Sequence, residues 1–252
     1  MNPYDTRNEH GRIDFEGLPN TRDLGGLRTA DGREVRPGLL LRSGTLYFAT
    51  QEDLRRLIEQ YHLRAVVDLR GEAEMSEYPD PVDRLLGVSY LHADVLRGTV
   101  DGISQDAETR ARLEAARVDE VDPAGFMEQI YPHILLGESG VKAYRGLMRT
   151  VLETTEGSVL WHCHVGRDRC GMATMLVLSV LGVPMEAIEE DYLATNVYTD
   201  VPSDERTAAN IRFIRAAVAG VTAEFGGVVG YVREALGVDE SDLCELRGRY
   251  LR

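Results

Sequence analysis

The chain has 252 residues, a formal net charge of −14 and a sequence pI near 4.9. A chain this acidic repels nucleic acid and anionic membranes, so neither is an expected partner. It also repels phosphorylated substrates at long range, so a phosphate site would have to be a local cluster of positive charge.

Neither a signal peptide nor a membrane span is visible in the sequence. The opening segment MNPYDTRNEHGR is polar, and the most apolar run, Met172 to Met185, is shorter than the roughly 20 residues that a spanning helix needs. The three cysteines are Cys163, Cys170 and Cys244. This odd and sparse set does not suit a disulfide framework and fits a reducing compartment. We therefore expect a soluble, cytoplasmic protein, and the sequence indicates no oligomeric state.

The first half of the chain alternates predicted strands and helices. Residues 36–44 are a predicted strand that ends at a glycine turn, and 50–61 are a predicted helix with Thr50 as its N-cap. The segments 63–70 and 87–95 are two further predicted strands. Strands that alternate with helices are typical of an α/β protein with a parallel sheet.

Residues 97–125 interrupt this pattern with a polar, charged segment. A helix is predicted within it, from about 106 to 118. The segment is either a solvated surface insertion or a lid-like element over a site, and the sequence leaves both interpretations open.

The second half is predominantly helical. Residues 139–155 are a predicted amphipathic helix, 157–163 the next strand, and 170–182 an apolar helix. Further helices are predicted near 184–195, 203–219, 226–236 and 239–251. The sequence therefore predicts an α/β fold with a central, mostly parallel sheet of about four to five strands, flanked by helices. With no repeat or long linker, residues 1–252 are expected to form one domain whose helical C-terminal portion is 184–252.

The stretch HCHVGRDRCG, residues 162–171, places two cysteines, two histidines and two arginines at the end of a predicted strand. In open α/β sheets, reactive sites lie at the carboxyl ends of strands, which is where Cys163 falls. The amides that follow can line a concave loop, since Gly166 permits the backbone angles of a tight turn. Such a loop at a helix N-terminus binds a tetrahedral oxyanion.

The spacing of the loop favours attack of sulfur on phosphorus. Arg169 lies six positions after Cys163, so the loop can close and direct the guanidinium at two phosphate oxygens. The same positive field would lower the pKa of Cys163 and make it a thiolate at neutral pH. The histidines are scattered along the chain, so neither a metal site nor a cofactor is predicted.

His162 and Cys163, followed by five residues and Arg169, resemble the H-C-x5-R signature of the cysteine-dependent protein tyrosine phosphatases. The GRDRCG portion is similar to the GKDRTG of a bacterial and fungal branch of that family. Further blocks resemble the same branch: NTRDLGG (20–26), LLLRSGTL (39–46), VVDLRGEAE (66–74), EDYLATN (190–196) and GGVVGYVREALGV (226–238). Because these blocks follow in order along nearly the whole chain, the resemblance extends well beyond the loop.

The resemblance implies a role for each loop residue. Cys163 would be the nucleophile, and Arg169 would bind the transferring phosphoryl group. Asp168 would protonate the leaving oxygen and then activate water for the second step. The remaining loop residues would line the phosphate pocket: His164, Val165, Gly166 and Arg167.

Residues outside the loop are expected in supporting positions. His162 would orient the loop and tune the thiol, or else be a hydrogen-bonded core histidine. Arg22 and Asp23 lie in a glycine-rich turn that, by resemblance, approaches the site, or else they form a structural salt-bridged turn. Asp68 and Arg70 could hold the loop from a strand end, or else form an ordinary strand-end ion pair. Asp94, at the end of another predicted strand, is a second candidate for the acid and ranks below the aspartate of the loop.

Three loop positions depart from the branch. Cys170 replaces a hydroxyl residue that stabilises the thiolate as leaving group, which leaves the rate of phosphoenzyme breakdown open. It could instead form a protective disulfide with Cys163, or be a small packing residue. Arg167 replaces a lysine and offers a fork to a second anionic group. His164 could narrow the pocket floor or point outward.

The sequence therefore predicts metal-independent hydrolysis of phosphomonoesters through a cysteinyl-phosphate intermediate. The substrate is either a phosphotyrosine protein or a small phosphorylated metabolite: a nucleotide, phosphosugar, biosynthetic intermediate or phosphoinositide. The family favours the first, whereas the acidity and the three departures favour the second. Two remote alternatives are a rhodanese-like sulfurtransferase, in which Asp168 would have no task, and an inactive phosphate-binding module, which the intact Cys163 and Arg169 disfavour.

Overall fold

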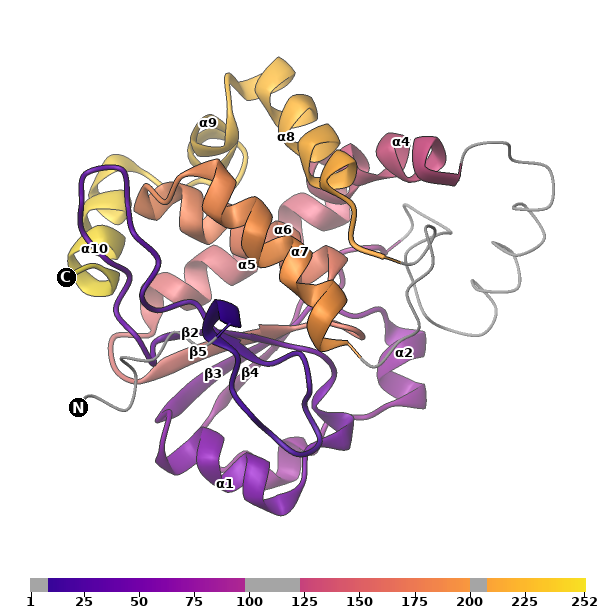
Figure 1. The fold of residues 1–252 in the computed structure, drawn as a ribbon, viewed down its shortest axis with the longest axis vertical. Coiled ribbons are helices and arrows are strands. Elements are labelled where there is room, and N and C mark those ends of the chain that lie inside the picture. The colour runs from indigo at the N-terminus through magenta and orange to yellow at the C-terminus, as the bar shows by residue number, and fades with distance from the viewer. Residues whose placement is uncertain (1–8, 98–122, 200–207) are drawn as a thin grey trace.

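The computed structural model of the protein describes residues 9–97, 123–199 and 208–252. These residues form an α/β fold on a five-stranded sheet in the order β1-β2-β5-β3-β4 (Figure 1). The strands are β1 (Arg22–Asp23), β2 (Leu40–Ser43), β3 (Leu63–Asp68), β4 (Ser89–His92) and β5 (Ser158–His162). β1 pairs antiparallel with β2, and the other pairings are parallel. The predicted mostly parallel sheet flanked by helices is therefore confirmed.

The helices in the described ranges agree in most places with the predicted ones. They are α1 (Gln51–Glu59), α2 (Glu72–Glu77), α4 (Pro123–Leu136), α5 (Glu138–Glu153), α6 (Asp168–Leu181), α7 (Met185–Tyr198), α8 (Ile211–Phe225), α9 (Val228–Glu234) and α10 (Glu240–Tyr250). Short 3-10 turns are η1 (Glu9–Gly11), η2 (Leu46–Phe48) and η3 (Val82–Arg84). α1 begins as predicted, because the Thr50 hydroxyl accepts the Asp53 amide and the Asp53 carboxylate accepts the Thr50 amide, both at 3.1 Å.

Several elements differ from the predictions, and the short elements β1 and α2 were not predicted. The helix expected at 170–182 begins two residues earlier, at Asp168. α4 was not predicted, and it carries Pro132 in its interior, a residue that usually ends a helix pattern. The helix expected at 203–219 begins at Ile211 in the part that the structure describes. Most of the predicted insertion or lid at 97–125 lies outside the described residues.

The two central strands, β3 and β5, turn their side chains alternately toward two apolar clusters. Val66 and Leu160 pack in a cluster with Leu57 of α1 on one face of the sheet. Val67 and Trp161 belong to the larger cluster on the other face. This is the two-residue period of a strand buried on both sides. Figure 1 shows α1 on one side of the sheet, with α5 and α6 on the other.

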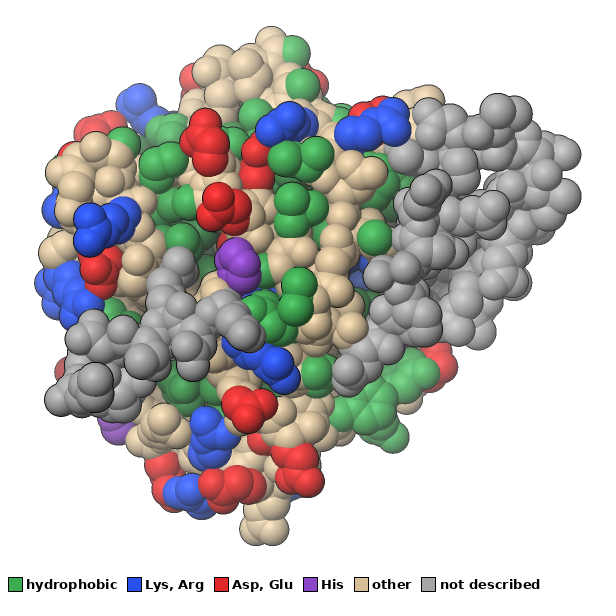
Figure 2. Space-filling model, in the orientation of Figure 1, with side chains coloured by type: hydrophobic (Ala, Val, Ile, Leu, Met, Phe, Trp, Pro, Cys, Tyr) green, Lys and Arg blue, Asp and Glu red, His purple; other side chains and the backbone are tan. Residues whose placement is uncertain are grey.

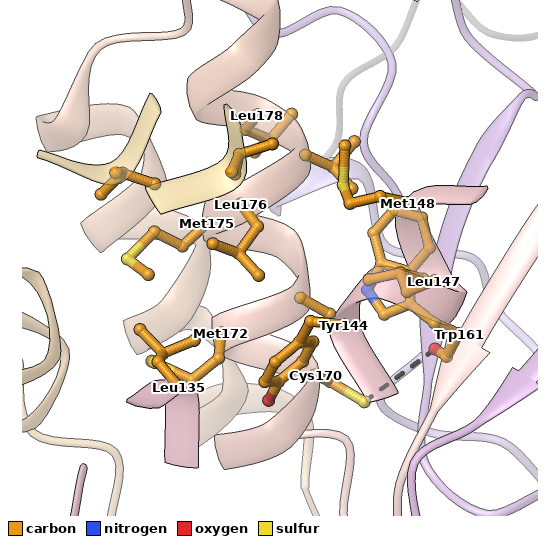
Figure 3. Packing of buried hydrophobic residues seen from close by; sticks show 14 of the residues in the cluster. Leu135, Tyr144, Leu147, Met148, Trp161, Cys170, Met172, Met175, Leu176 and Leu178 are labelled. Carbon is orange, nitrogen blue, oxygen red and sulfur yellow. Dashed lines mark hydrogen bonds between the residues drawn. The ribbon is translucent and has the colours of Figure 1, made fainter. Parts of the chain in front are cut away.

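The larger cluster fixes the helix that follows the candidate loop. Figure 3 shows Trp161 beside Leu147 and Met148 of α5. Met172 and Leu176 of α6 belong to the same cluster. α6 is apolar around almost its whole circumference, so it is buried on nearly all sides. The position of its N-terminus, where the loop ends, is therefore set by core packing.

Basic side chains lie both on the surface and in the core. On the face shown in Figure 2, acidic and basic groups are interspersed. Exposed ion pairs include those of Arg55 with Glu52 and Glu59 on α1. The arginines among the largest fully buried side chains are Arg22, Arg42, Arg70 and Arg169. The local cluster of positive charge that a phosphate site requires therefore lies inside the molecule.

Within the described ranges, no single helix has both the length and the apolar composition needed to cross a membrane. α8 and α9 meet the length and composition criteria only when they are taken together, and this pair is bent by 57°. Both helices contribute to the larger core cluster, through residues such as Phe213 and Val232.

Candidate active site

The loop between β5 and α6 has Cys163 at its start and ends in the first turn of the helix. It leaves the sheet at the carboxyl end of β5, which is the central strand. Gly166 has a φ of +78°, and a Cβ there would lie 2.6 Å from the Ser43 carbonyl oxygen. Only glycine therefore fits this turn, which lies against the end of β2.

Donors from outside the loop bind its carbonyl oxygens: the Thr45 amide, the Asn20 side-chain amide and the Arg42 guanidinium. The carbonyls of His164, Val165 and Gly166 accept these hydrogen bonds at 2.8, 2.9 and 2.7 Å, respectively. In a trans peptide the carbonyl and the next N–H point in opposite directions. Each outward carbonyl therefore turns the following amide toward the inside of the loop, where an oxyanion would be bound.

A buried ion cluster holds these donors in place. Asp191 of α7 binds Arg22 Nε at 3.1 Å through one carboxylate oxygen and Arg42 through the other. Arg22 also donates to the Asp191 carbonyl and to Thr195. All three charged side chains are 3% exposed or less. Arg22 therefore lies behind the loop with each of its guanidinium nitrogens bound to a protein group, Asn20 included, and it supports the loop from there.

Replacing Asp191 with asparagine is expected to lower the free energy of unfolding by about 3–5 kcal/mol, because two buried guanidinium groups lose their counter-ion. Urea denaturation would measure this. Glu52→Gln is the matched control, since Glu52 also pairs with an arginine but is exposed. The midpoint of urea unfolding of this variant should equal that of the wild-type protein. A midpoint for the Asp191 variant equal to that of the control would contradict the assigned role.

The thiol of Cys163 is buried, with the residue 2% exposed. Burial by itself raises the pKa of this thiol. A hydrogen bond from the Cys170 thiol, the charge of Arg169 and the Cys170 amide together outweigh burial and lower the pKa to about 6. Cys163 is therefore a thiolate at neutral pH, the form that acts as a nucleophile.

Cys170 remains a thiol beside this thiolate. Burial and the neighbouring Cys163 hold the pKa of Cys170 well above its usual value, so its sulfur keeps a proton to donate. It lies 3.5 Å from the Ser43 carbonyl oxygen and 3.9 Å from that of Trp161 (Figure 3). Neither cysteine is part of a disulfide in the structure, and the disulfide between them stays a prediction.

The guanidinium of Arg169 is 2% exposed and oriented by a residue that the sequence did not single out. Glu74 of α2 binds Nη1 at 2.5 Å and Nη2 at 2.8 Å. Nη1 also reaches the Leu69 carbonyl, at 3.4 Å. Within the described residues Nε is buried without a hydrogen-bond partner, which leaves one oriented donor for a ligand.

Asp168, the first residue of α6, has charged and polar partners on both carboxylate oxygens. Arg167 Nε lies 2.9 Å from Oδ1 and 3.1 Å from Oδ2, and the Tyr131 hydroxyl donates to Oδ1. Burial raises the pKa of Asp168, but the charge and hydrogen bond of Arg167 and the Tyr131 hydrogen bond outweigh it and lower the pKa. The Arg167 guanidinium, which was expected to bind a second anionic group, therefore binds Asp168 in this structure.

His162 is buried beneath the loop, beside two carboxylates. Its Nε2 lies 2.9 Å from Asp80 and 3.8 Å from Asp68, and its Nδ1 donates to the Cys163 carbonyl at 3.3 Å. Burial lowers the pKa of His162, but the two carboxylates outweigh this effect and raise it. The cluster lies at the ends of neighbouring strands. It includes Asp68, whose role in holding the loop stays a prediction, and Asp80, which was not anticipated.

Asp68, Asp80 and His162 are also close enough together to hold a metal ion. Their oxygens are already engaged, since Arg70 Nη2 lies 2.7 Å from Asp68 and 3.0 Å from Asp80. The Tyr90 hydroxyl is within hydrogen-bond distance of both carboxylates. We therefore interpret the group as an ion-pair cluster that supports the loop.

The contacts of three other expected site residues differ in range. Asp23 links its own turn to a later one by accepting the amides of Gly25 and Gly38 at 2.8 and 2.7 Å. Asp94 likewise accepts the Leu96 amide, at 3.0 Å. His164 is half-buried, and its ring packs edge-on against that of Tyr78, with centroids 4.9 Å apart.

Comparison with known proteins identifies the family. Residues 13–252 match the sequence model of the tyrosine phosphatase family. A protein of Cupriavidus necator that is named as a tyrosine-protein phosphatase is 33% identical over 264 residues, which cover 96% of this chain and 89% of that protein. The triple specificity protein phosphatase PtpB of Mycobacterium tuberculosis is 26% identical over 285 residues, which cover 93% of this chain and 97% of that protein.

Among solved structures, TpbA of P. aeruginosa in complex with pTyr aligns over 96% of both chains, with a TM-score of 0.40 and 17% identity. A similarity this low carries no argument about fold or function. The family match, in contrast, covers nearly the whole chain, including the loop that follows β5. The chain therefore belongs to the tyrosine phosphatase family and is a phosphatase.

Proposed function

We propose that the protein hydrolyses phosphomonoesters in two steps through a cysteinyl-phosphate. In the first step, the Cys163 thiolate attacks phosphorus, the phosphorus–oxygen ester bond breaks, and the leaving oxygen takes a proton from Asp168. In the second step, water attacks phosphorus, the Asp168 carboxylate takes a proton from it, and the phosphorus–sulfur bond breaks. The products are inorganic phosphate and the regenerated thiolate.

The geometry that carries this proposal is the position of Cys163 at the carboxyl end of β5, beside Arg169 and Cys170, which lower its pKa to about 6 despite burial. The causes are donors and a cation, the same groups that stabilise a phosphoryl group. Arg169 supports the proposal independently, because its buried Nε has no hydrogen-bond partner among the described residues. A bound phosphoryl oxygen would satisfy that donor.

The first step needs a protonated Asp168, whereas the lowered pKa of this group keeps it ionised in the free enzyme. Binding of a phosphate dianion beside the carboxylate changes this balance, because two like charges at close range disfavour each other. Substrate binding therefore raises the pKa of Asp168 and favours proton uptake before the ester bond breaks. The same carboxylate, once it has given up its proton, is the base for the second step.

We propose phosphotyrosine as the substrate group, which is the activity named for the relatives. An aromatic cluster beside the loop supports this choice, and its members are Tyr47, Phe48, Tyr78 and His164. Tyr47 and Phe48 are 45% and 55% exposed, respectively. Exposed rings next to the loop suit an aromatic ester and offer little to a hydroxyl-rich sugar phosphate.

A substrate comparison tests this proposal. We expect kcat/KM on a phosphotyrosine peptide to exceed that on hexose phosphates and nucleoside monophosphates by at least about 10-fold, with no loss in the presence of a chelator. Phe48→Ala should lower kcat/KM on the peptide about 5-fold and leave sugar phosphates unaffected, because a ring contact of roughly 1 kcal/mol is lost. Leu86→Ala, at another exposed apolar residue, is the control. A preference for a metabolite would overturn the substrate assignment and leave the chemistry standing.

A further inference from the structure

Two buried tyrosines from different helices meet at the carboxylate of Asp168. The Tyr131 hydroxyl of α4 donates to Asp168 Oδ1, and the Tyr192 hydroxyl of α7 lies 2.8 Å from that of Tyr131. The two tyrosines are 0% and 1% exposed. The hydroxyl pair is therefore shielded from water and connects the acid of the loop to helices that lie outside it.

The core holds both rings, so the hydroxyl positions are fixed. The Tyr131 ring packs on Phe213 of α8, with centroids 5.0 Å apart. The Tyr192 ring lies so close to α6 that a Cβ on Gly171 would be 2.7 Å from its Cδ2. Glycine at this position lets the two helices approach, and the ring has little freedom to turn.

The direction of the hydrogen bonds follows from the chemistry of the groups. A carboxylate only accepts hydrogen bonds, so the Tyr131 hydroxyl donates one to Asp168. The Tyr131 oxygen then accepts a hydrogen bond from the Tyr192 hydroxyl. Burial and the neighbouring Asp168 raise the pKa of both phenols, so both stay protonated. The chain is thus a fixed pair of donors that ends on Oδ1, in a shielded setting where such bonds strengthen one another.

The groups facing Asp168 are not equivalent at its two oxygens. Among the described residues, Oδ1 accepts from Tyr131 and Arg167, whereas Oδ2 accepts from Arg167 Nε alone, at 3.1 Å. The other charged groups that act on the carboxylate are Arg169 of the same helix and the Cys163 thiolate. Oδ2 is therefore the oxygen that can carry a proton to the substrate.

We propose that Tyr131, backed by Tyr192, is a positioning residue that holds Asp168 by Oδ1 and so presents Oδ2 to the leaving oxygen. This inference rests on the proposed function, in which Asp168 acts first as an acid and then as a base. The phenols touch neither the substrate nor the transferred phosphoryl group. They act by restricting the rotation of the carboxyl group and by stabilising its ionised form.

Tyr131→Phe removes the hydroxyl and keeps the ring, which separates positioning from packing. We expect kcat/KM on phenyl phosphate to fall about 10- to 100-fold relative to p-nitrophenyl phosphate, because a misplaced acid assists a poor leaving group least. The ionisation of Asp168 in the pH profile of kcat/KM should move to higher pH, since the carboxylate loses a donor. Tyr192→Phe should change both measurements in the same direction and by less. Asp168→Asn sets the limit for complete loss of the acid.

Tyr250→Phe is the matched control, because this buried tyrosine also donates to a single oxygen, the Val151 carbonyl at 2.8 Å. It should alter neither the leaving-group dependence nor the pH profile. Equal losses of kcat/KM on both aryl phosphates, with an unchanged pH profile, would overturn the inference. If the Tyr131 variant does not fold, the same two measurements on Tyr192→Phe decide. Failure of the proposed function would differ, because the wild-type protein would then lack phosphatase activity or keep it after Cys163→Ser.

Discussion

Replacing Cys163 with serine is expected to lower kcat on aryl phosphates by on the order of 10⁴- to 10⁶-fold, the range seen when a catalytic nucleophile is removed. The reason is the ionisation state. The thiol has its pKa lowered to about 6 and is mostly thiolate at neutral pH, whereas a serine hydroxyl stays protonated in the same surroundings. Phosphate binding should survive, since the loop amides and Arg169 are unchanged. Steady-state kinetics and phosphate titration calorimetry would measure the two effects separately.

The matched control is Cys244→Ser, because Cys244 is exposed and lies on α10. This variant should keep the wild-type kcat. Quenched-flow samples of wild-type protein should contain a phosphorylated peptide that includes residue 163, and the Cys163 variant should contain none. Activity that survives Cys163→Ser and is lost with a chelator would mean that a metal-activated water does the chemistry, and the cysteinyl-phosphate would be wrong.

Local sequence predicts the elements whose stability is local. α1 has its capping residues, Thr50 and Asp53, within one turn, and β3 has an apolar run of its own. β1 is only two residues long and pairs with β2, so no periodicity could reveal it. α4 carries Pro132, and it is stabilised by packing, with Tyr131 and Ile134 fully buried. Tertiary contacts there outweigh the cost of a proline.

The same distinction explains which parts of the site could be predicted. Cys163, Asp168 and Arg169 are close together in the chain, so their spacing shows that they share one loop. The partners that orient them come from distant segments: Glu74 binds Arg169 across 95 positions, and Tyr131 binds Asp168 across 37. Such pairings depend on where the sheet and helices place each residue. The VVDLRGEAE block contains Glu74, but no local pattern in the sequence pairs it with Arg169. Tyr131 lies outside all the matched blocks.

The expected loss for Arg169→Lys is about 10²- to 10³-fold in kcat/KM, although lysine keeps the charge. Glu74 holds Nη1 and Nη2 of the guanidinium and leaves Nε as an oriented donor. A lysine ammonium group cannot donate to both oxygens of Glu74 in the same way and also direct a donor at the phosphoryl group. Arg215→Lys is the matched control, because Arg215 binds Glu189 through the same kind of fork, at 2.7 and 2.9 Å, on the surface of α8.

Charge and geometry can be separated at this position by following the Cys163 thiolate directly. The rate of alkylation by iodoacetate should rise with pH through about 6 in the wild-type protein, since only the thiolate reacts. The Arg169 charge helps to lower this pKa, so Arg169→Gln should move the rise to higher pH, whereas Arg169→Lys should leave it closer to the wild-type position. Mass spectrometry locates the alkylated residue. If the glutamine variant titrates at the wild-type pH, the Cys170 hydrogen bonds alone ionise the thiol, and Arg169 acts on the phosphoryl group only.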